Sequence, residues 1–362
     1  MSSFQSGTIA FICVFFIFAS RKESKEEFEI QMFLSLSNLS VGYRNHVVLS
    51  NLNLSAAECE LVALIGRNGA GKSTLMRTIA RLQPAISGEV IIAGKLLGRY
   101  SRNELAGMLS IVSTDPAGAS HLTVRQLVSF GRFPYTNWIG KLTAEDIVLV
   151  EEAMQLTGVT SLENKRLHEI SDGERQRAMI ARTMAQDTGL ILLDEPTAFL
   201  DMPNKYEVVY LLHRLTRTKR KTILFSTHDL NIAMQAADKL WLMIDGDLYE
   251  GAPEDMVLNH QLARVFEGTK LHFDDRKGEF NIRRKDTQQI TLAGEGKSFF
   301  WTKKALERLG FSVRKEDDEQ QANVTISEGA SVLWTVFLHG NRITFSSIYD
   351  LSKYLKKYNF GI

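Results

Sequence analysis

A glycine-rich segment beginning at Gly66 has the residue types and spacing of a phosphate-binding loop. Its sequence, GRNGAGKST, matches the pattern G-x-x-x-x-G-K-[ST] and follows the apolar run Leu61–Ile65, which is typical of a buried strand. Glycines let the backbone curl so that its N–H groups point at phosphate oxygens, at the positive end of the helix expected over residues 72–81. Lys72 is then expected to reach the β- and γ-phosphates of a nucleotide, and the Ser73 hydroxyl to ligate Mg²⁺.

A pair of acidic residues supplies the other half of a metal–phosphate site. Asp194 and Glu195 directly follow a second apolar run, Leu190–Leu193. A carboxylate at the end of a buried strand can hold Mg²⁺ through water, so Asp194 and Ser73 are the expected metal-binding residues. Glu195 can polarise a water molecule for attack on the γ-phosphate and is the expected catalytic base. Alone, such a pair is more often a solvated turn, but a full phosphate loop in the same chain favours the metal site.

A third segment, Ile170-Ser171-Asp172-Gly173-Glu174, opens an amphipathic helix expected to run to about Ala185. Ser171 with Glu174 three residues later has the pattern of a capping box. A helix that starts with Ser and Gly is also suited to bind an anion, because the helix dipole is positive there. Capping and phosphate contact are compatible, so the pattern alone does not decide between them.

In their order, these motifs resemble the ATP-binding cassette ATPases over about residues 32–268. The phosphate loop is followed by ISDGE at 170–174, LLDEPT at 192–197, FLD at 199–201 and STHD at 226–229. The resemblance implies an α/β fold with a mixed sheet, a parallel core and a helical subdomain. It also implies a head-to-tail dimer of two copies, with ATP and Mg²⁺ at the two sites of the interface.

The resemblance also implies roles for individual residues. Ser171, Asp172, Gly173 and Glu174 form the signature, which would bind the ATP held by the other subunit. His228 would be a second catalytic residue, the switch histidine at the γ-phosphate, and Asp201 would link the two sites. Tyr43 matches the aromatic residue that stacks on adenine. The implied ATP-binding residues are Tyr43, Gly66, Arg67, Asn68, Gly69, Ala70, Gly71, Lys72, Ser73 and Thr74.

The chain departs from the family pattern in two places. The signature usually reads LSGGQ and here reads ISDGE, although the Ser and the second Gly, which contact phosphate, are kept. After the strand expected at 109–113 the family has a Gln, where this chain has Thr114 followed by Asp115. Asp115 either takes over the contact to Mg²⁺, directly or through water, or forms an Asx turn before Pro116. In the second case Mg²⁺ would be held by Ser73, Asp194 and water.

Residues 123–140 indicate what the ATPase would drive. The pattern V-x-x-G-R-x-P at 128–134 resembles importers of iron-siderophore, haem and cobalamin complexes, in the region that docks on the permease. Phe133, Tyr135, Trp138 and Ile139 favour an interface there over a local core. The implied partners are an integral membrane permease and, through it, a substrate-binding protein, which would place the chain at the cytoplasmic face of the inner membrane.

Other functions remain as alternatives or are disfavoured. A soluble cassette ATPase of the iron–sulfur assembly type is the alternative, since it too carries a single cassette. A P-loop kinase is disfavoured because it would leave the signature and His228 unexplained. The 43 Lys and Arg residues balance 42 Asp and Glu residues, which argues against a nucleic-acid partner. Cys13 and Cys59 form no metal-ligand spacing and too few pairs for a disulfide scaffold, as fits a reducing cytosol.

The length of 362 residues, with 44% hydrophobic and 23% charged residues, predicts two unequal globular domains. The composition changes near Gly268, so we expect the cassette over 32–268 and an accessory α+β domain over 269–362. Helices are expected there at 298–309, with Ser298 as N-cap, and at 347–358. The expected strands are 271–273, 280–282, 290–292, 311–313, 324–326 and 332–338.

The accessory domain contains a segment, Gly294–Ser298, that looks like the end of a phosphate loop. A complete loop would need glycine at position 291, which is Thr. We therefore interpret this segment as a turn and a helix cap. Because the domain lacks a clustered set of acid, base and metal ligands, we expect it to be a regulatory or dimer-stabilising module.

Residues 1–31 are expected to be an N-terminal extension. The run Ile9–Ala19 has eleven apolar residues, fewer than the roughly 18–20 needed to span a bilayer. A true translation start at Met32, a peripheral membrane anchor and a signal peptide all remain open. The signal peptide is disfavoured because Met1 to Thr8 carry no positively charged side chain.

Overall fold

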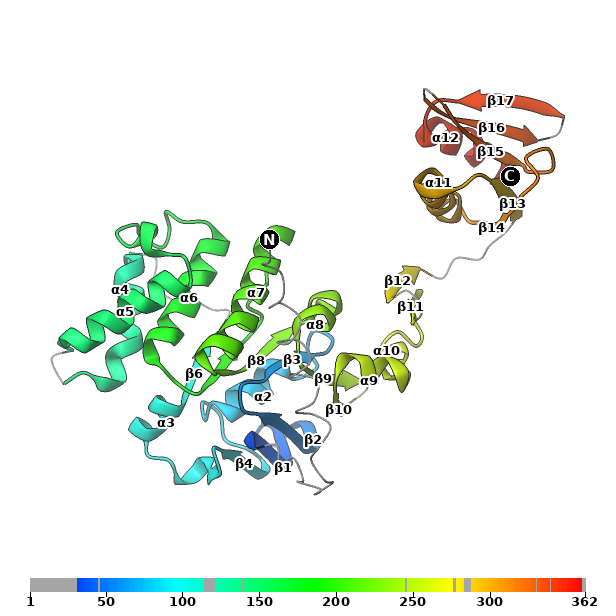
Figure 1. The fold of residues 1–362 in the computed structure, drawn as a ribbon. Coiled ribbons are helices and arrows are strands. Elements are labelled where there is room, and N and C mark those ends of the chain that lie inside the picture. The colour runs from blue at the N-terminus through cyan, green and yellow to red at the C-terminus, as the bar shows by residue number, and fades with distance from the viewer. Residues whose placement is uncertain are drawn as a thin grey trace, which may run out of the picture. The chain divides into compact units, whose positions relative to one another are not determined.

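The chain folds into two compact units, Met1–Asn259 and His260–Ile362 (Figure 1). The composition change near Gly268 therefore lies inside the second unit. The computed structural model describes residues 31–44, 46–113, 121–137, 140–244, 246–275, 278–282, 288–329, 331–338 and 340–359. The apolar run Ile9–Ala19 lies outside these residues.

The first unit is built around a six-stranded sheet. Its strand order is β10 (Asp247–Gly251), β9 (Lys239–Ile244), β3 (Leu61–Ile65), β8 (Thr222–Thr227), β7 (Leu190–Leu193) and β6 (Leu109–Val112). All neighbours are parallel except β10 and β9. Every residue of β3, β7 and β8 is buried, as the continuous apolar runs predict for strands covered on both faces.

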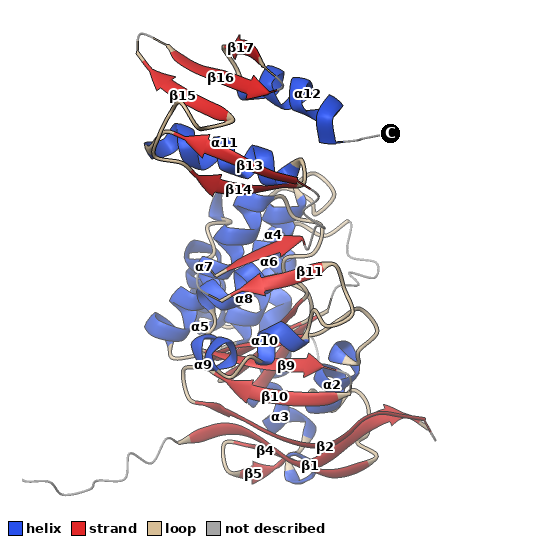
Figure 2. Ribbon diagram, turned by 90° about the vertical axis from the view of Figure 1, so that its right-hand side faces the viewer, coloured by secondary structure: helices blue, strands red, loops and turns tan. Residues whose placement is uncertain are grey.

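A second, antiparallel sheet of four strands lies beside the first. Its order is β2 (His46–Ala57), β1 (Met32–Tyr43), β4 (Ser87–Ile92) and β5 (Lys95–Leu96). The helix that follows the phosphate loop, α2 (Lys72–Ile79), packs its apolar side chains Leu75, Met76 and Ile79 into a core shared by residues of both sheets. It thus lies between the two sheets (Figure 2).

The remaining helices of this unit form a helical subdomain and a cover for the parallel sheet. The subdomain consists of α4 (Val124–Ser129), η2 (Phe130–Tyr135), α5 (Ala144–Leu156), η3 (Thr160–Leu162) and α6 (Asp172–Gln186). The other helices are η1 (Leu97–Arg99), α3 (Arg102–Met108), α7 (Met202–Lys219), α8 (Leu230–Ala236) and α9 (Pro253–Leu258). α6 also contacts β6, while α7 and α8 contact β3. This mixed sheet with a parallel core and a helical subdomain confirms the expected fold class.

The second unit is an α+β structure. It contains α10 (Gln261–Arg264), the hairpin β11 (Leu271–Asp274) and β12 (Glu279–Ile282), and the helices α11 (Gly296–Arg308) and α12 (Ile348–Asn359). Its five-stranded sheet has the order β14 (Phe311–Lys315), β13 (Gln288–Ala293), β15 (Val324–Glu328), β16 (Val332–Leu338) and β17 (Asn341–Phe345). β13 is parallel to β14 and β15, and the other neighbours are antiparallel.

Two details of the second unit differ from the sequence-based expectation. Ser298 is not the N-cap of α11, because the helix begins at Gly296 and Glu295 is its N-cap. The carbonyl of Ser298 accepts a hydrogen bond from the Thr302 hydroxyl (2.7 Å) inside the helix. The strand β17 was not expected, since its sequence NRITF has too few apolar residues to stand out. In the described residues, no helix is both long and apolar enough to cross a membrane.

Candidate functional site

The phosphate loop connects β3 to α2 and holds Lys72 in a buried position. Gly71 has φ 103°, and a Cβ there would lie 2.7 Å from Cγ1 of Val48, so this position requires glycine. The side chain of Lys72 is 5% exposed, and its Nζ donates to the carbonyls of Gly66 (2.9 Å) and Arg67 (3.3 Å). The ammonium therefore folds back over the loop, where phosphate oxygens are expected to bind.

The acidic pair meets this lysine at the same edge of the sheet. β7 and β3 both border β8 in parallel, so their carboxyl ends lie at one edge. Oε1 of Glu195 lies 3.8 Å from Nζ of Lys72, and Asp194 is 6% exposed. The structure thus brings together two predicted residues that are 123 positions apart in the sequence.

Ser226 holds the acidic pair in place, a role that sequence reasoning missed. Its hydroxyl donates to Oδ1 of Asp194 (2.7 Å) and accepts from the backbone N–H of Glu195 (2.8 Å). Ser226 is fully buried in β8, whose register pairs Leu193 with Phe225. Once β7 and β8 are known to be parallel neighbours, the residue after Leu193 is expected to lie beside the residue after Phe225, but the sequence alone does not show that they are neighbours.

Glu195 has an unusual backbone conformation, with φ 49°. Residues other than glycine rarely adopt a positive φ, and such strain concentrates at functional sites. The hydrogen bond from its N–H to Ser226 helps to stabilise this conformation. The chain turns at this residue directly after β7, and the Glu195 side chain is left partly exposed (27%) and close to Lys72.

Tyr43 lies at the end of β1 beside the start of α2. The Thr74 hydroxyl donates to the Tyr43 hydroxyl (3.2 Å), and the tyrosine is 50% exposed. The aromatic ring is thus anchored next to the phosphate loop and still presents surface to solvent. That combination suits a side chain that stacks on a nucleotide base.

The signature segment forms the capping box that its spacing predicts. The backbone N–H of Glu174 donates to Oγ of Ser171 (3.2 Å), and the N–H of Ser171 donates to the Glu174 carboxylate (2.8 Å). The hydrogen bond from the backbone N–H of Ser171 to the Glu174 carboxylate is the main reason that the pKa of Glu174 is lowered. Asp172 forms an ion pair with Arg175 (3.0 Å) on the first turn of α6.

A contact through Asn204 connects the signature to Asp201. Asp201 caps α7 and accepts from the backbone N–H (3.1 Å) and from the side-chain amide (2.6 Å) of Asn204. A Cβ at Gly173 would lie 2.5 Å from Oδ1 of that Asn204 side chain, so a larger residue at this position would displace the Asn204 side chain. Sequence reasoning missed Asn204, which shows no motif of its own.

Other predicted residues are not brought into the same cluster. Across the described ranges, no hydrogen bond or ion pair joins residues 171–174 to the phosphate loop. A cavity of about 180 Å³ nevertheless has Asp172, Asp194 and Glu195 in its lining. His228 follows β8 and is exposed. Thr114 and Asp115 lie outside the described residues.

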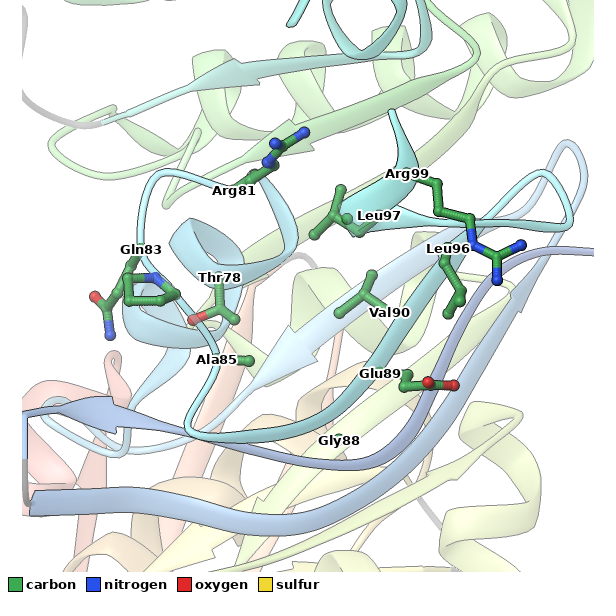
Figure 3. Close-up of a pocket in the computed structure, with 12 residues that line it drawn as sticks. Thr78, Arg81, Gln83, Ala85, Gly88, Glu89, Val90, Leu96, Leu97 and Arg99 are labelled. Atoms are coloured by element: carbon green, nitrogen blue, oxygen red, sulfur yellow. The ribbon is translucent and has the colours of Figure 1, made fainter. Parts of the chain in front are cut away.

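A larger cavity of about 360 Å³ lies elsewhere in the first unit (Figure 3). It is lined by Thr78, Arg81 and Gln83 at and after the end of α2, by Val90 of β4, and by the segment 96–99. Its lining contains no residue of the phosphate loop or of the acidic pair. This cavity is thus separate from the candidate nucleotide site.

The segment 128–134 exposes aromatic side chains over a buried arginine. Arg132 donates to Asp146 (2.8 Å) and to the carbonyl of Ala185 (2.9 Å), and its guanidinium lies 4.0 Å from the ring centre of Tyr135. Phe133 is 66% exposed and, with Phe130, lines an open cavity of about 520 Å³. Trp138 and Ile139 lie outside the described residues.

Comparison with protein families finds two matches in this chain. Residues 49–198 match the ABC transporter family, a range that contains the phosphate loop, the signature and the acidic pair. Residues 287–356 match the iron ABC transporter C-terminal domain, which lies within the second unit.

Individual relatives agree with the family matches. The chain is 39% identical over 234 residues to the probable siderophore transport system ATP-binding protein YusV of Bacillus subtilis, covering 64% of this chain and 85% of YusV. Among solved structures, a putative metal-chelate type ABC transporter in an inward-facing conformation matches with a TM-score of 0.58 and 26% identity, over 69% of this chain and 96% of that chain. The dimeric bacterial ABC transporter cassette MJ0796 matches with a TM-score of 0.54 and 26% identity, over 61% of this chain and 98% of that chain.

Proposed function

Since this chain belongs to the ABC transporter ATP-binding proteins and is an ATPase, we propose that it energises the import of an iron chelate through a separate membrane permease. The observation that carries this proposal is the combination of two matches in one chain. The cassette resembles a siderophore-transport ATP-binding protein, and the second unit matches a C-terminal domain described for iron ABC transporters. Both point to the same class of cargo, and they favour import over iron–sulfur assembly.

The proposed chemistry is hydrolysis of ATP at the edge where β3 and β7 end. The phosphate loop and Lys72 bind the β- and γ-phosphates, while Tyr43 stacks on the adenine. Glu195 orients the attacking water and accepts its proton, and Ser226 positions Glu195 by accepting a hydrogen bond from its backbone N–H. The oxygens of Ser73 and buried Asp194 are of the type that Mg²⁺ prefers, and that ion supplies charge neutralisation at the phosphates when it is bound.

The proposed active form is a head-to-tail dimer of two copies. The dimeric cassette among the similar structures supports this arrangement. In this proposal, Ser171, Gly173 and Glu174 contact the ATP held by the other copy, and Asp201 connects the two sites. The close packing of Gly173 on Asn204, whose amide donates to Asp201, supports a coupled movement of these two segments. His228 contacts the γ-phosphate in the same proposal.

We propose that the exposed aromatic segment of the helical subdomain docks on the permease. Arg132 is 8% exposed and Asp146 is 4% exposed, so their ion pair anchors η2 on α5 while Phe130 and Phe133 remain accessible. An exposed apolar surface beside a cavity of about 520 Å³ is suited to accept a helix of a partner protein. The chain would then lie at the cytoplasmic face of the membrane, and a substrate-binding protein would act through the permease.

The proposed function is tested by uptake of a radioactive iron chelate in cells that lack this chain. Uptake should return with the wild-type chain and not with Glu195→Gln, although both proteins should be present at equal amounts. Phe133→Ala should lower uptake and co-sedimentation with permease-containing membranes, while Tyr210→Ala, an equally exposed aromatic on α7 (69%), should not. Iron uptake that is unchanged in cells lacking the chain would contradict the proposal.

A further inference from the structure

The two edge strands of the five-stranded sheet in the second unit, β14 and β17, differ in how many charged residues they carry. At one edge, β14 carries Arg314 and Lys315, and Lys315 forms ion pairs with Glu295 (3.6 Å) and Asp317 (3.4 Å). At the other edge, β17 has one charged residue, Arg342, and no proline. Charges are among the devices that keep an edge strand from pairing with another chain. The β14 edge has this protection, and the β17 edge has little of it.

The β17 edge is also regular and open. β17 pairs with β16 over its whole length without a register shift, from Trp334 opposite Phe345 to Leu338 opposite Asn341. In the strand order, β17 is the last strand, so among the described residues its outer backbone groups have no neighbouring strand (Figure 1). A straight edge strand of this kind offers free N–H and C=O groups to a further strand.

The side chains of β17 leave an apolar residue exposed at this edge. Ile343 lies opposite Val336, which is buried in the core beneath α11 and α12, so both face the helices. Val336 is 1% exposed, whereas Ile343 is 36% exposed because no strand covers its outer side. Burial of Ile343 therefore requires a partner at the outer edge.

We propose that β17 pairs antiparallel with β17 of a second copy of this chain, with Ile343 opposite Ile343. In this register, Arg342 faces Thr344 and Asn341 faces Phe345 of the second copy, so no like charges are directly opposite. On the helix-covered face the two Ile343 side chains bury each other. The two five-stranded sheets thereby join into one continuous sheet.

The symmetry of this pairing agrees with the cassette dimer. An antiparallel strand paired with itself is related by a two-fold axis, as is a closed dimer of two identical cassettes. A contact five residues long is weak alone, but the chain connection raises its effective concentration once either contact has formed. The inference thus gives the second unit a dimer-holding role, and it rests on the proposed function only through the proposed cassette dimer.

The pairing is tested by disulfide cross-linking of the full chain, in a background with Cys13→Ser and Cys59→Ser. Ile343→Cys should form cross-linked dimers under mild oxidation, with and without ATP, because directly opposite Cβ atoms of paired strands are about 4.5–5.5 Å apart. Leu333→Cys is the matched control, since Leu333 is 37% exposed and lies on the other face of β16. Absent cross-links at Ile343, or equal yields at both positions, would overturn the proposal.

A second measurement determines the dimer dissociation constant of the full-length chain in the absence of nucleotide. Ile343→Lys should raise the dimer dissociation constant at least about tenfold in sedimentation experiments, since it places two like charges opposite each other. Ser312→Lys, at an exposed position on the opposite edge strand β14, should leave this constant unchanged. Equal dimer dissociation constants for the wild type and Ile343→Lys would refute the pairing. Iron uptake that does not depend on this chain, in the presence of β17 cross-links, would count only against the proposed function.

Discussion

The described part of the chain contains two places where a strand enters a glycine-containing connection and then a helix. In the first unit the fully buried β3 leads through Gly66–Gly71 into α2, and in the second β13, which is buried only toward its end, leads through Gly294 and Glu295 into α11. Both helices have Lys followed by Ser in their first turn. Only the first has six loop residues between strand and helix, which is enough backbone to surround a phosphate.

The surroundings of the two lysines differ more than the sequences do. Lys72 is buried and bonded to the loop carbonyls, whereas Lys297 is exposed. At the first helix the acidic pair arrives from a separate strand, and Glu195 forms an ion pair with Lys72 (3.8 Å). At the second, Glu295 is the N-cap residue, but its side chain makes no capping hydrogen bond and its carboxylate forms an ion pair with Lys315 (3.6 Å) instead. Both segments contain the sequence Gly-Lys-Ser, so it is the loop length and the neighbouring strands that distinguish a phosphate site from a simple turn.

The largest expected effect is on catalysis at the acidic pair. Glu195→Gln should lower ATP turnover at least ~10²-fold, because an amide cannot accept the proton of the attacking water. ATP binding should persist, and ATP-trapped dimers should appear in size-exclusion chromatography. The matched variant Glu295→Gln, at the turn of the second unit, should leave turnover unchanged. Activity of Glu195→Gln above about a tenth of wild type would show that Glu195 is not the base.

The two lysines are expected to differ in nucleotide binding. Lys72→Ala should weaken ATP binding by about 10- to 150-fold, since hydrogen bonds to charged groups contribute about 1.5–3 kcal/mol. Lys297→Ala should not change the affinity, because its turn is too short to hold a phosphate. Calorimetric titration of both variants with ATP measures the difference. A similar loss of affinity in both variants would remove the distinction between the two turns.

Two buried serines sharpen the comparison further. Ser226→Ala should cost about 1–3 kcal/mol of stability, because it leaves the N–H of Glu195 without its partner. Asp194 and Glu195 should then be held less firmly, and turnover should fall about tenfold, which corresponds to a rise of about 1.4 kcal/mol in the activation free energy. Ser352 of α12 is also buried (6% exposed), but its Oγ has no hydrogen-bond partner in the described part of the chain. Ser352→Ala should therefore be neutral or stabilising in thermal unfolding, and an equal cost for both would be inconsistent with this account.

The smallest expected effect comes from removing most of the second unit. A chain that ends at Gly268 should bind ATP within about twofold of the full chain, because the first unit has its own core and contains the whole candidate site. Fluorescence titration with an ATP analogue would measure this. Lost binding in a truncated chain that is soluble and folded would show that the second unit contributes to the nucleotide site.

Much of the candidate site was predictable because its parts are local in sequence. The loop at Gly66, the capping box of Ser171 and Glu174, and the strand that ends at Asp194 each depend on residues within a few positions. The expected fold class followed from the resemblance of the ordered motifs to the ATP-binding cassette ATPases and is confirmed. The interpretation of Gly294–Ser298 as a turn and a helix cap was wrong about the cap, because α11 already begins at Gly296 and spacing alone does not fix where a helix starts.

The sequence by itself determined which residues can bind phosphate, hold Mg²⁺ and accept a proton, because these abilities depend on side-chain type and on short-range backbone geometry. Only the tertiary structure decided that Ser226 holds Asp194 and Glu195, that Asn204 connects Gly173 to Asp201, and that β17 forms an open edge. These features depend on which strands are neighbours and in what register. Strand pairing brings together backbone groups that are alike in every residue, so no local pattern in the sequence specifies it.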